Sequence, residues 1–325
     1  VLSGLSMAVA YSAFIRDGRS WAHFFIRRIF RIWPLLWVAV TAVILGQVMF
    51  KGREVDWILV LLNVTTLFGF VSPGAYINTG AWSIGNEMVY YALTPAFLAA
   101  YNHKVWIGNV AVAMTVAIGL YFGFHAITIQ ATLASQWQTY INPMNNMFFY
   151  CIGLALYYNT GKRSFSPSWT IPLLVVSLAV FVWYPTNGDL VNIVTGINRI
   201  VFILASTLLV LSFYKFTFTP PRWLSRPLTR LGVAPYGVYL FHPIVFQFVQ
   251  LFAQKLGWIS QPYVVITLTV LLTILVSIVH YDWCEAPFIR LGKRLTIERK
   301  VLCHKAKPGA AGDARCDLEQ INSRR

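Results

Sequence analysis

The sequence has few charged residues. Asp, Glu, Lys and Arg together make up 11% of the 325 residues, whereas an ordinary soluble domain carries roughly 25%. This deficit excludes a large water-facing surface, and hydrophobic residues, at 57%, take the place of the missing charges. The composition therefore excludes an ordinary soluble enzyme domain and indicates an integral membrane protein.

Cysteine and acidic residues are also scarce. The four cysteines, Cys151, Cys284, Cys303 and Cys316, form no C-x-x-C pair, so we predict free thiols and expect no metal site. The 11 acidic residues face 26 basic ones, which gives a formal net charge of +15. Because basic residues beside membrane spans hold loops in the cytoplasm, this excess does not require a nucleic-acid partner.

Long apolar segments recur along almost the whole chain. They comprise residues 1–15, 24–50, 57–70, 82–101, 105–124, 142–159, 169–184, 192–214, 231–254 and 261–283. Most approach the roughly 20 residues that a helix needs to cross the hydrocarbon core. The third segment has only 14 residues, a length more typical of a re-entrant or interfacial piece. The pattern predicts an all-α, polytopic membrane helical bundle.

The positions of Lys and Arg decide how many segments cross. If residues 57–81 stay on the outer side, 22 of the 26 basic residues fall on the inner side and three fall outside, as the positive-inside rule expects. We therefore predict nine spans and one re-entrant or interfacial segment, with the first span running inward. We expect a membrane domain over residues 1–295 and a basic, disordered cytoplasmic tail over residues 296–325, able to contact membrane lipids.

Two arginines lie near the start of the second segment. Arg28 and Arg31 are three residues apart and share a helix face. Paired guanidinium groups can hold phosphate oxygens bidentately, as a nucleotide-bearing donor such as coenzyme A requires. Alternatively, the two arginines only anchor the helix at the inner surface. The spacing leaves both interpretations open.

Trp82, Ser83 and Glu87 lie at the outer start of the fourth segment. Ser83 and Glu87 share a helix face at a spacing of four residues. A carboxylate near a helix N-terminus is favoured by the helix dipole, so Glu87 can be structural. Polar groups at membrane depth are also candidates for function. In that interpretation, Glu87 hydrogen-bonds a sugar hydroxyl or orients a catalytic base.

Tyr239, His242 and Pro243 lie halfway along the ninth segment. Pro243 cannot donate to the carbonyl of Tyr239, which predicts a kinked helix with a free carbonyl beside a Tyr and a His. Such breaks line cavities or meet polar partners, so His242 is either a site residue or an ordinary interhelical hydrogen-bonding residue. Arg199, inside another span, needs a partner, for which Glu87 or a substrate anion would serve.

Five short motifs, taken in order, resemble the acyltransferase 3 family of bacterial membrane O-acyltransferases, which includes O-antigen and exopolysaccharide acetylases. They are Val1–Gly4, Arg27–Pro34, Trp82–Glu87 followed by Tyr90, Tyr91 and Pro95, Tyr239–Pro243, and Glu285–Pro287. The resemblance implies a ten-span fold with both ends cytoplasmic, in the bacterial inner membrane. It further implies an acyl-CoA donor, with acetyl-CoA expected, and an envelope glycan or glycolipid acceptor.

The predicted site combines the resemblance with the residues above. We expect Glu87 and His242 to be catalytic, Arg28 and Arg31 to bind the donor, and Ser3, Trp82, Ser83, Tyr239 and Arg199 to bind substrate. The family carries an Arg and a His eleven residues apart in its first span, and no such pair precedes Val1. We therefore expect that this first span is missing, and without it the fragment can lack activity on its own. A transporter or flippase for an envelope glycolipid, or a non-catalytic membrane partner, remain alternatives.

Overall fold

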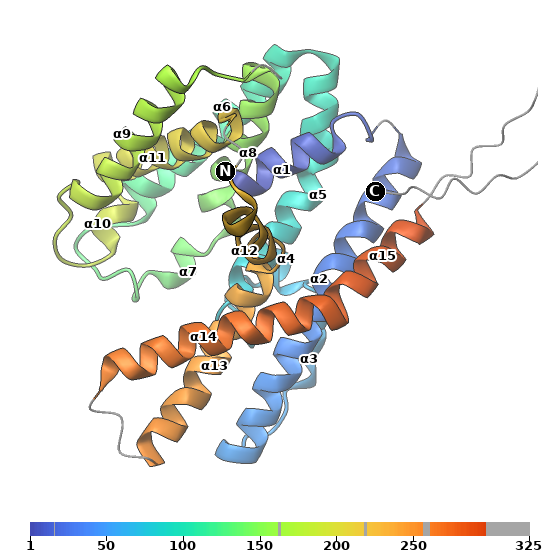
Figure 1. Ribbon diagram of the computed structural model, residues 1–325, viewed down its shortest axis with the longest axis vertical. Helices are drawn as coiled ribbons and strands as arrows, with labels where there is room; N and C mark the ends of the chain where they lie inside the picture. Colours follow the sequence, from blue (N-terminus) through green and yellow to red (C-terminus); the bar gives the residue numbers. More distant parts are fainter. Residues whose placement is uncertain (16, 162–163, 218–219, 256–260, 297–325) are drawn as a thin grey trace, which may run out of the picture.

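The computed structural model describes residues 1–15, 17–161, 164–217, 220–255 and 261–296, and these residues form helices and loops without strands. Figure 1 shows the arrangement. The helices are α1 (Leu2–Tyr11), α2 (Gly18–Lys51), α3 (Trp57–Val64), α4 (Phe68–Val71), α5 (Ala81–His103), α6 (Val105–Tyr121), η1 (Phe122–Ala126), α7 (Trp137–Tyr140), α8 (Pro143–Thr160), α9 (Pro167–Trp183), α10 (Val191–Val194), α11 (Gly196–Lys215), α12 (Arg222–Val233), α13 (Pro235–Lys255), α14 (Pro262–His280), η3 (Tyr281–Glu285) and α15 (Ala286–Leu295).

The predicted all-α fold is confirmed, and each of the ten apolar segments contains helix. The segment predicted at residues 82–101 is α5, which spans residues 81–103, and the one predicted at 142–159 is α8, which spans 143–160. Five helices are long and apolar enough to cross a membrane by length and composition. Two further apolar helices, α1 and α9, have only 10 and 17 residues. Nine spans therefore remain a prediction.

The short third segment folds as two short helices followed by a loop. At 1.5 Å per residue, the eight residues of α3 extend about 12 Å, far less than the roughly 30 Å of the hydrocarbon core. The Asp56 carboxylate caps α3 by accepting from the backbone N–H of Ile58 and Leu59. Asn63 then donates to the carbonyl of Ala75, which folds the following loop back onto α3. This segment is therefore not one long helix, and its place as a re-entrant or interfacial segment on the outer side remains a prediction.

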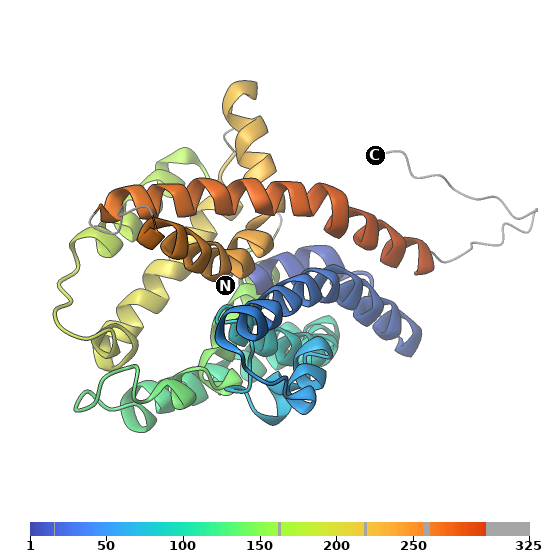
Figure 2. The same cartoon turned by 90° about the horizontal axis from the view of Figure 1, so that it is seen from below.

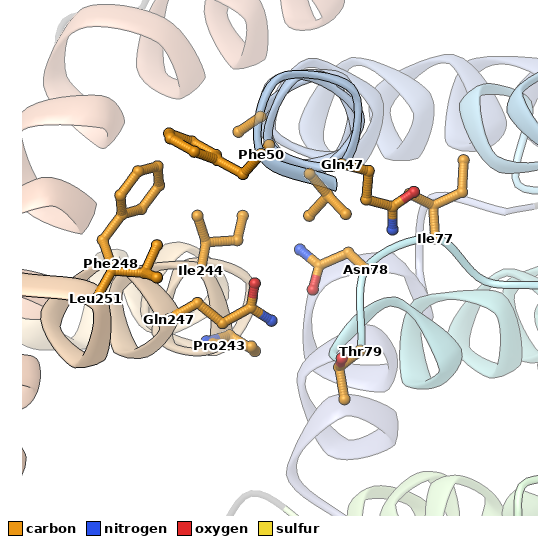
Figure 3. Close-up of a pocket in the computed structure, with 13 residues that line it drawn as sticks. Gln47, Phe50, Ile77, Asn78, Thr79, Pro243, Ile244, Gln247, Phe248 and Leu251 are labelled. Carbon is orange, nitrogen blue, oxygen red and sulfur yellow. The ribbon is translucent and has the colours of Figure 1, made fainter. Parts of the chain in front are cut away.

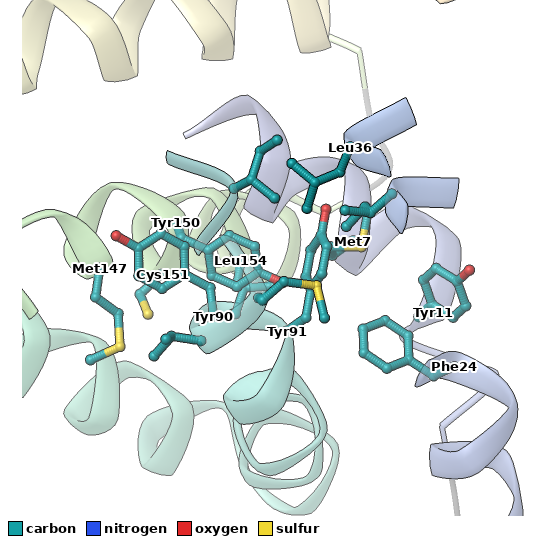
Figure 4. Close-up of a cluster of buried hydrophobic side chains, with 14 of the residues drawn as sticks. Met7, Tyr11, Phe24, Leu36, Tyr90, Tyr91, Met147, Tyr150, Cys151 and Leu154 are labelled. Carbon is teal, nitrogen blue, oxygen red and sulfur yellow. The ribbon is translucent and has the colours of Figure 1, made fainter. Parts of the chain in front are cut away.

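Several of the described helices pack in pairs. α9 lies beside α11 and α13 beside α14 (Figure 1). Along one side, α14, η3 and α15 continue one another as a long rod (Figure 2). The largest buried cluster forms where α1, α2, α5 and α8 meet (Figure 4), and includes Met7, Phe24, Leu36, Tyr91 and Leu154. This junction positions the residues considered next.

Of the expected tail, only Thr296 lies among the described residues. Its side chain is buried and accepts from Arg27 Nε at 2.6 Å, so the packed domain extends one residue beyond the predicted boundary. The remainder of the tail, with Cys303 and Cys316, lies outside the described residues. Cys151 and Cys284 are free thiols, as predicted.

Candidate active site

Glycine contacts hold the start of α1 close against α8. This packing places α1 next to the first turns of α5. A Cβ on Gly4 would lie 1.8 Å from the carbonyl oxygen of Tyr150, and one on Gly153 would lie 2.0 Å from that of Val1. Only glycine permits so close an approach of α1 and α8. The contact places Ser3 beside α5, where its hydroxyl donates to Glu87 Oε1 at 2.8 Å.

A cavity of about 400 Å³ opens beside Glu87. Hydrogen-bonding and aromatic side chains line it, together with Val1: Ser3, Trp82, Ser83, Asn86, Glu87, Tyr90, Tyr140, Asn146, Phe149 and Tyr150. Four of the predicted site residues, Ser3, Trp82, Ser83 and Glu87, therefore share one cavity. A pocket of this size with a few polar groups between aromatic walls suits a small organic ligand.

Glu87 is held by two hydroxyl groups. Ser3 and Tyr91 both donate to its Oε1 atom, so Oε2 remains as an acceptor for a third donor. Tyr91 lies one helical turn after Glu87 on the same face of α5. The Tyr236 hydroxyl of α13 is buried beside the same carboxylate. The carboxylate thus sits at the edge of the cavity in a fixed orientation.

Arg28 points into the protein and Arg31 does not. The Arg28 residue is 7% exposed, and its Nη2 atom donates to the Tyr11 hydroxyl at 2.6 Å. Its Nε and Nη1 atoms are buried and have no partner. Arg28 Cζ also lies 5.6 Å from the ring centre of Tyr91, so Tyr91 links this guanidinium to Glu87. Arg31 is exposed, and neither arginine lines the cavity itself.

His242 directly precedes Pro243 in α13 and does not line the cavity beside Glu87. Its Nδ1 atom is 2.7 Å from the Tyr239 carbonyl oxygen, so the carbonyl freed by Pro243 is taken up by the His242 ring. Because a carbonyl only accepts, Nδ1 carries the proton and Nε2 is left as the acceptor. Asn78 donates to the next carbonyl, that of Leu240, at 3.0 Å. The Tyr239 carbonyl packs against Gly80 at the start of α5.

Arg199 is separate from Glu87. It is 4% exposed, and its Nη2 atom donates at 2.7 Å to both the main-chain and side-chain oxygens of Asn145. Its Nη1 atom donates to the Val194 carbonyl at 3.0 Å. The partner of this buried cation is therefore a set of neutral oxygens that join α11 to α8, and the prediction that Glu87 could be its partner is wrong.

Comparison with known proteins assigns this chain to a family. The model of the acyltransferase 3 family, described as an acyltransferase domain, matches residues 1–282. The chain belongs to this family. Its apolar helices agree with a multi-pass membrane protein.

One curated relative of this acyltransferase is the peptidoglycan O-acetyltransferase OatA of Listeria monocytogenes serovar 1/2a (strain ATCC BAA-679 / EGD-e). The two are 25% identical over 275 residues, which cover 68% of this chain and 39% of the relative. The acyltransferase thus spans about two fifths of that relative's length. No solved structure matches it.

A second cavity of the acyltransferase, of about 280 Å³, lies between α2, residues 77–79 and the second half of α13 (Figure 3). All of its lining residues are uncharged, and the amides of Gln47, Asn78 and Gln247 are its main polar groups. Residues 77–83 separate the two cavities, because Thr79 lines this one whereas Trp82 and Ser83 line the other.

The sequence interpretation missed several residues of the first cavity. Tyr91, which bonds to Glu87 but does not line the cavity, could also have been found from its spacing of four residues to Glu87. Tyr140 and Asn146 come from α7 and α8, and no local pattern relates them to α5. Asn86 belongs to the Trp82–Glu87 motif, but the sequence analysis assigned it no role. Among the described residues, no group of three His, Cys, Asp or Glu side chains is placed to hold a metal ion.

Proposed function

We propose that this acyltransferase moves an acyl group, acetyl in the first instance, from acyl-CoA to a hydroxyl of an envelope carbohydrate at the bacterial inner membrane. The family membership, and a relative named as a peptidoglycan O-acetyltransferase, support O-acetylation of a carbohydrate. The observation that carries the proposal is Glu87, a carboxylate with one open oxygen at a cavity wall, linked through Tyr91 to a buried arginine.

The donor binds through the arginines of α2. Arg28 has two buried N–H groups without partners, and a guanidinium with open donors favours a phosphate oxygen. Arg31, one turn further on and exposed, holds a second phosphate oxygen of the coenzyme A moiety. The thioester end then extends past Tyr91 toward Glu87.

The acceptor hydroxyl binds at Glu87 within the cavity, where Ser3, Trp82 and Ser83 surround it. The base takes the hydroxyl proton, and the oxygen attacks the thioester carbonyl. The new ester bond forms as the carbon–sulfur bond breaks, and the released thiolate takes up the proton. Glu87 is the base in this scheme, and His242, with Nε2 open and beside Tyr239, is the second candidate. Arg199 stabilises the α8–α11 contact.

Replacing Glu87 tests the proposal. Glu87→Gln keeps the shape and the contact with Ser3 but removes the proton acceptor, so transfer from radiolabelled acetyl-CoA to envelope carbohydrate should fall by about 10²- to 10⁴-fold. Glu54→Gln, the same change at an exposed loop residue, should leave the rate unchanged. A folded Glu87→Gln protein with the wild-type rate would rule out this role for Glu87.

A further inference from the structure

Asn86 is buried in α5 and has no hydrogen-bond partner for its side chain. The residue is 3% exposed, and both its Oδ1 and Nδ2 atoms lack a partner. It lines the cavity of about 400 Å³ beside Glu87. Native proteins rarely leave buried amides unpaired, so an unpaired one at a cavity wall indicates a group that binds there.

The other buried asparagines of the described chain behave differently. Asn63 donates to two carbonyls and accepts from the Ile77 N–H. Asn78 donates to Leu240 and accepts from the Gly80 N–H. In Asn145 the amide is likewise used at both ends. These three amides hold the fold together, whereas that of Asn86 contributes no such contact.

A hydroxyl and an amide that line the cavity wall together with Asn86 each donate to a main-chain carbonyl instead. The Tyr90 hydroxyl donates to the Pro143 carbonyl, at 3.1 Å. The Asn146 amide donates to the Tyr140 carbonyl, also at 3.1 Å. Asn86 therefore lines the cavity together with Trp82 and Tyr140, beside groups that donate to main-chain carbonyls.

We propose that Asn86 recognises the acceptor sugar and determines acceptor specificity. An amide offers one donor group and one acceptor group side by side. A neutral sugar can pair with both groups if it offers an acceptor and a donor next to each other. Two adjacent hydroxyls or one acetamido group provide that pair. Since Glu87 lines the same cavity, this pair lies beside the hydroxyl that is acylated. The inference rests on the proposed function and specifies which groups of the acceptor sugar Asn86 recognises.

The decisive variant is Asn86→Leu, which keeps the approximate volume and removes both polar atoms. We expect the KM for acceptor to rise at least tenfold, the KM for acyl-CoA to stay unchanged, and the melting temperature to stay equal or rise, because an unpaired buried amide is removed. Asn145→Leu is the matched control. It breaks the contact with Arg199, so its melting temperature should fall.

A structural role for Asn86 predicts the opposite pattern. An Asn86→Leu protein that melts lower, as Asn145→Leu does, and keeps the wild-type KM for acceptor overturns the inference. If Asn86→Leu does not fold, Asn86→Ala is measured in the same way, with the same two criteria.

Direct sugar binding separates this inference from the proposed function. Affinity is measured by tryptophan fluorescence for a neutral N-acetylhexosamine oligomer and for a neutral hexose oligomer, with the Glu87→Gln protein and its Asn86→Leu double variant. Loss of binding on adding Asn86→Leu supports the inference even if no acyl transfer is found. The oligomer that loses more affinity identifies the acetamido group or the diol as the recognised pair. Equal binding of both oligomers by both proteins rejects the inference.

Discussion

Buried arginines in this protein have two different environments. Arg199 is bonded to neutral oxygens on α8 and before α11, whereas Arg28 keeps two buried N–H groups open. Arg199 Nε is also buried without a partner, so the two arginines differ in degree. Three hydrogen bonds hold Arg199 in the helix packing, whereas one holds Arg28 and leaves it more donors for an anion. The distinction predicts different consequences for the same conservative substitution.

Arg28→Lys keeps the charge and loses the planar fork, so the affinity for coenzyme A should fall about tenfold or more. Arg31→Lys should have a smaller effect because an exposed charge is screened by solvent. Titration calorimetry of the purified proteins with coenzyme A measures both. Arg199→Lys is the control, and should lower the melting temperature without changing the coenzyme A affinity. Unaltered affinity in Arg28→Lys would exclude the donor site at this residue.

At the scale of whole elements, the site depends on how closely α1 approaches α8. The Gly4 and Gly153 contacts leave no room for a side chain, and α1 carries the Ser3 hydroxyl that orients Glu87. Packing of this helix pair is therefore coupled to the geometry of the cavity.

Gly4→Ala should push α1 away from α8 and remove the bond from Ser3 to Glu87. We expect both the melting temperature and the rate of acyl transfer to decrease. Gly232→Ala is the matched control, because a Cβ at Gly232 in α12 meets nothing within 4 Å, and alanine is the better helix former. A Gly4→Ala protein with wild-type stability would show that the close contact is not formed.

The loops before α7 and α10 are joined through Asp189. The Leu133 and Val191 N–H groups donate to its Oδ1 atom at 2.7 and 2.9 Å. The Leu133 bond first, and then the Val191 bond, lower the pKa of Asp189 below its usual value. A lowered carboxyl pKa contributes stability above the unfolded pKa, and this stability is lost as the pH falls through the folded value.

Acidification should therefore loosen this loop contact. The difference in melting temperature between wild type and Asp189→Asn should be constant near neutral pH and shrink below about pH 4, where Asp protonates. Asp56→Asn, which alters a cap on α3 instead, controls for general acid effects. A wild-type advantage that grows on acidification would contradict the assigned hydrogen bonds.

For the whole molecule, apolar segment length predicted where helices occur, and the order of the motifs predicted the family. Other features depend on tertiary contacts. The carbonyl freed by Pro243 was foreseen, but its capture by His242 itself was not. Arg199 was given the wrong candidate partner because residues 145 and 199 are distant in sequence. The open amide of Asn86 became evident only when Tyr140 and Asn146 closed the cavity around it.

Two contacts bring basic residues of different segments onto the rod formed by α14, η3 and α15. Arg230 of α12 forms a 2.8 Å ion pair with Asp282 of η3, and Arg27 near the start of α2 donates to Thr296, directly after α15. The shared orientation of the basic segments across the membrane remains a prediction from the charge distribution along the chain. We expect these basic segments to face the cytoplasm and the loop after α2 to face outward.

Cysteine labelling tests that orientation. In a chain whose four native cysteines are replaced by serine, Glu54→Cys lies after α2 and Thr229→Cys lies in α12, and both positions are exposed. A membrane-impermeant maleimide should label Glu54→Cys in cells whose inner membrane is intact and should label Thr229→Cys only after that membrane is permeabilised. The reverse labelling pattern would mean that the protein has the opposite orientation in the membrane. It would place Arg28 and Arg31 on the side away from cytoplasmic acyl-CoA, so the donor site and the orientation would fail together.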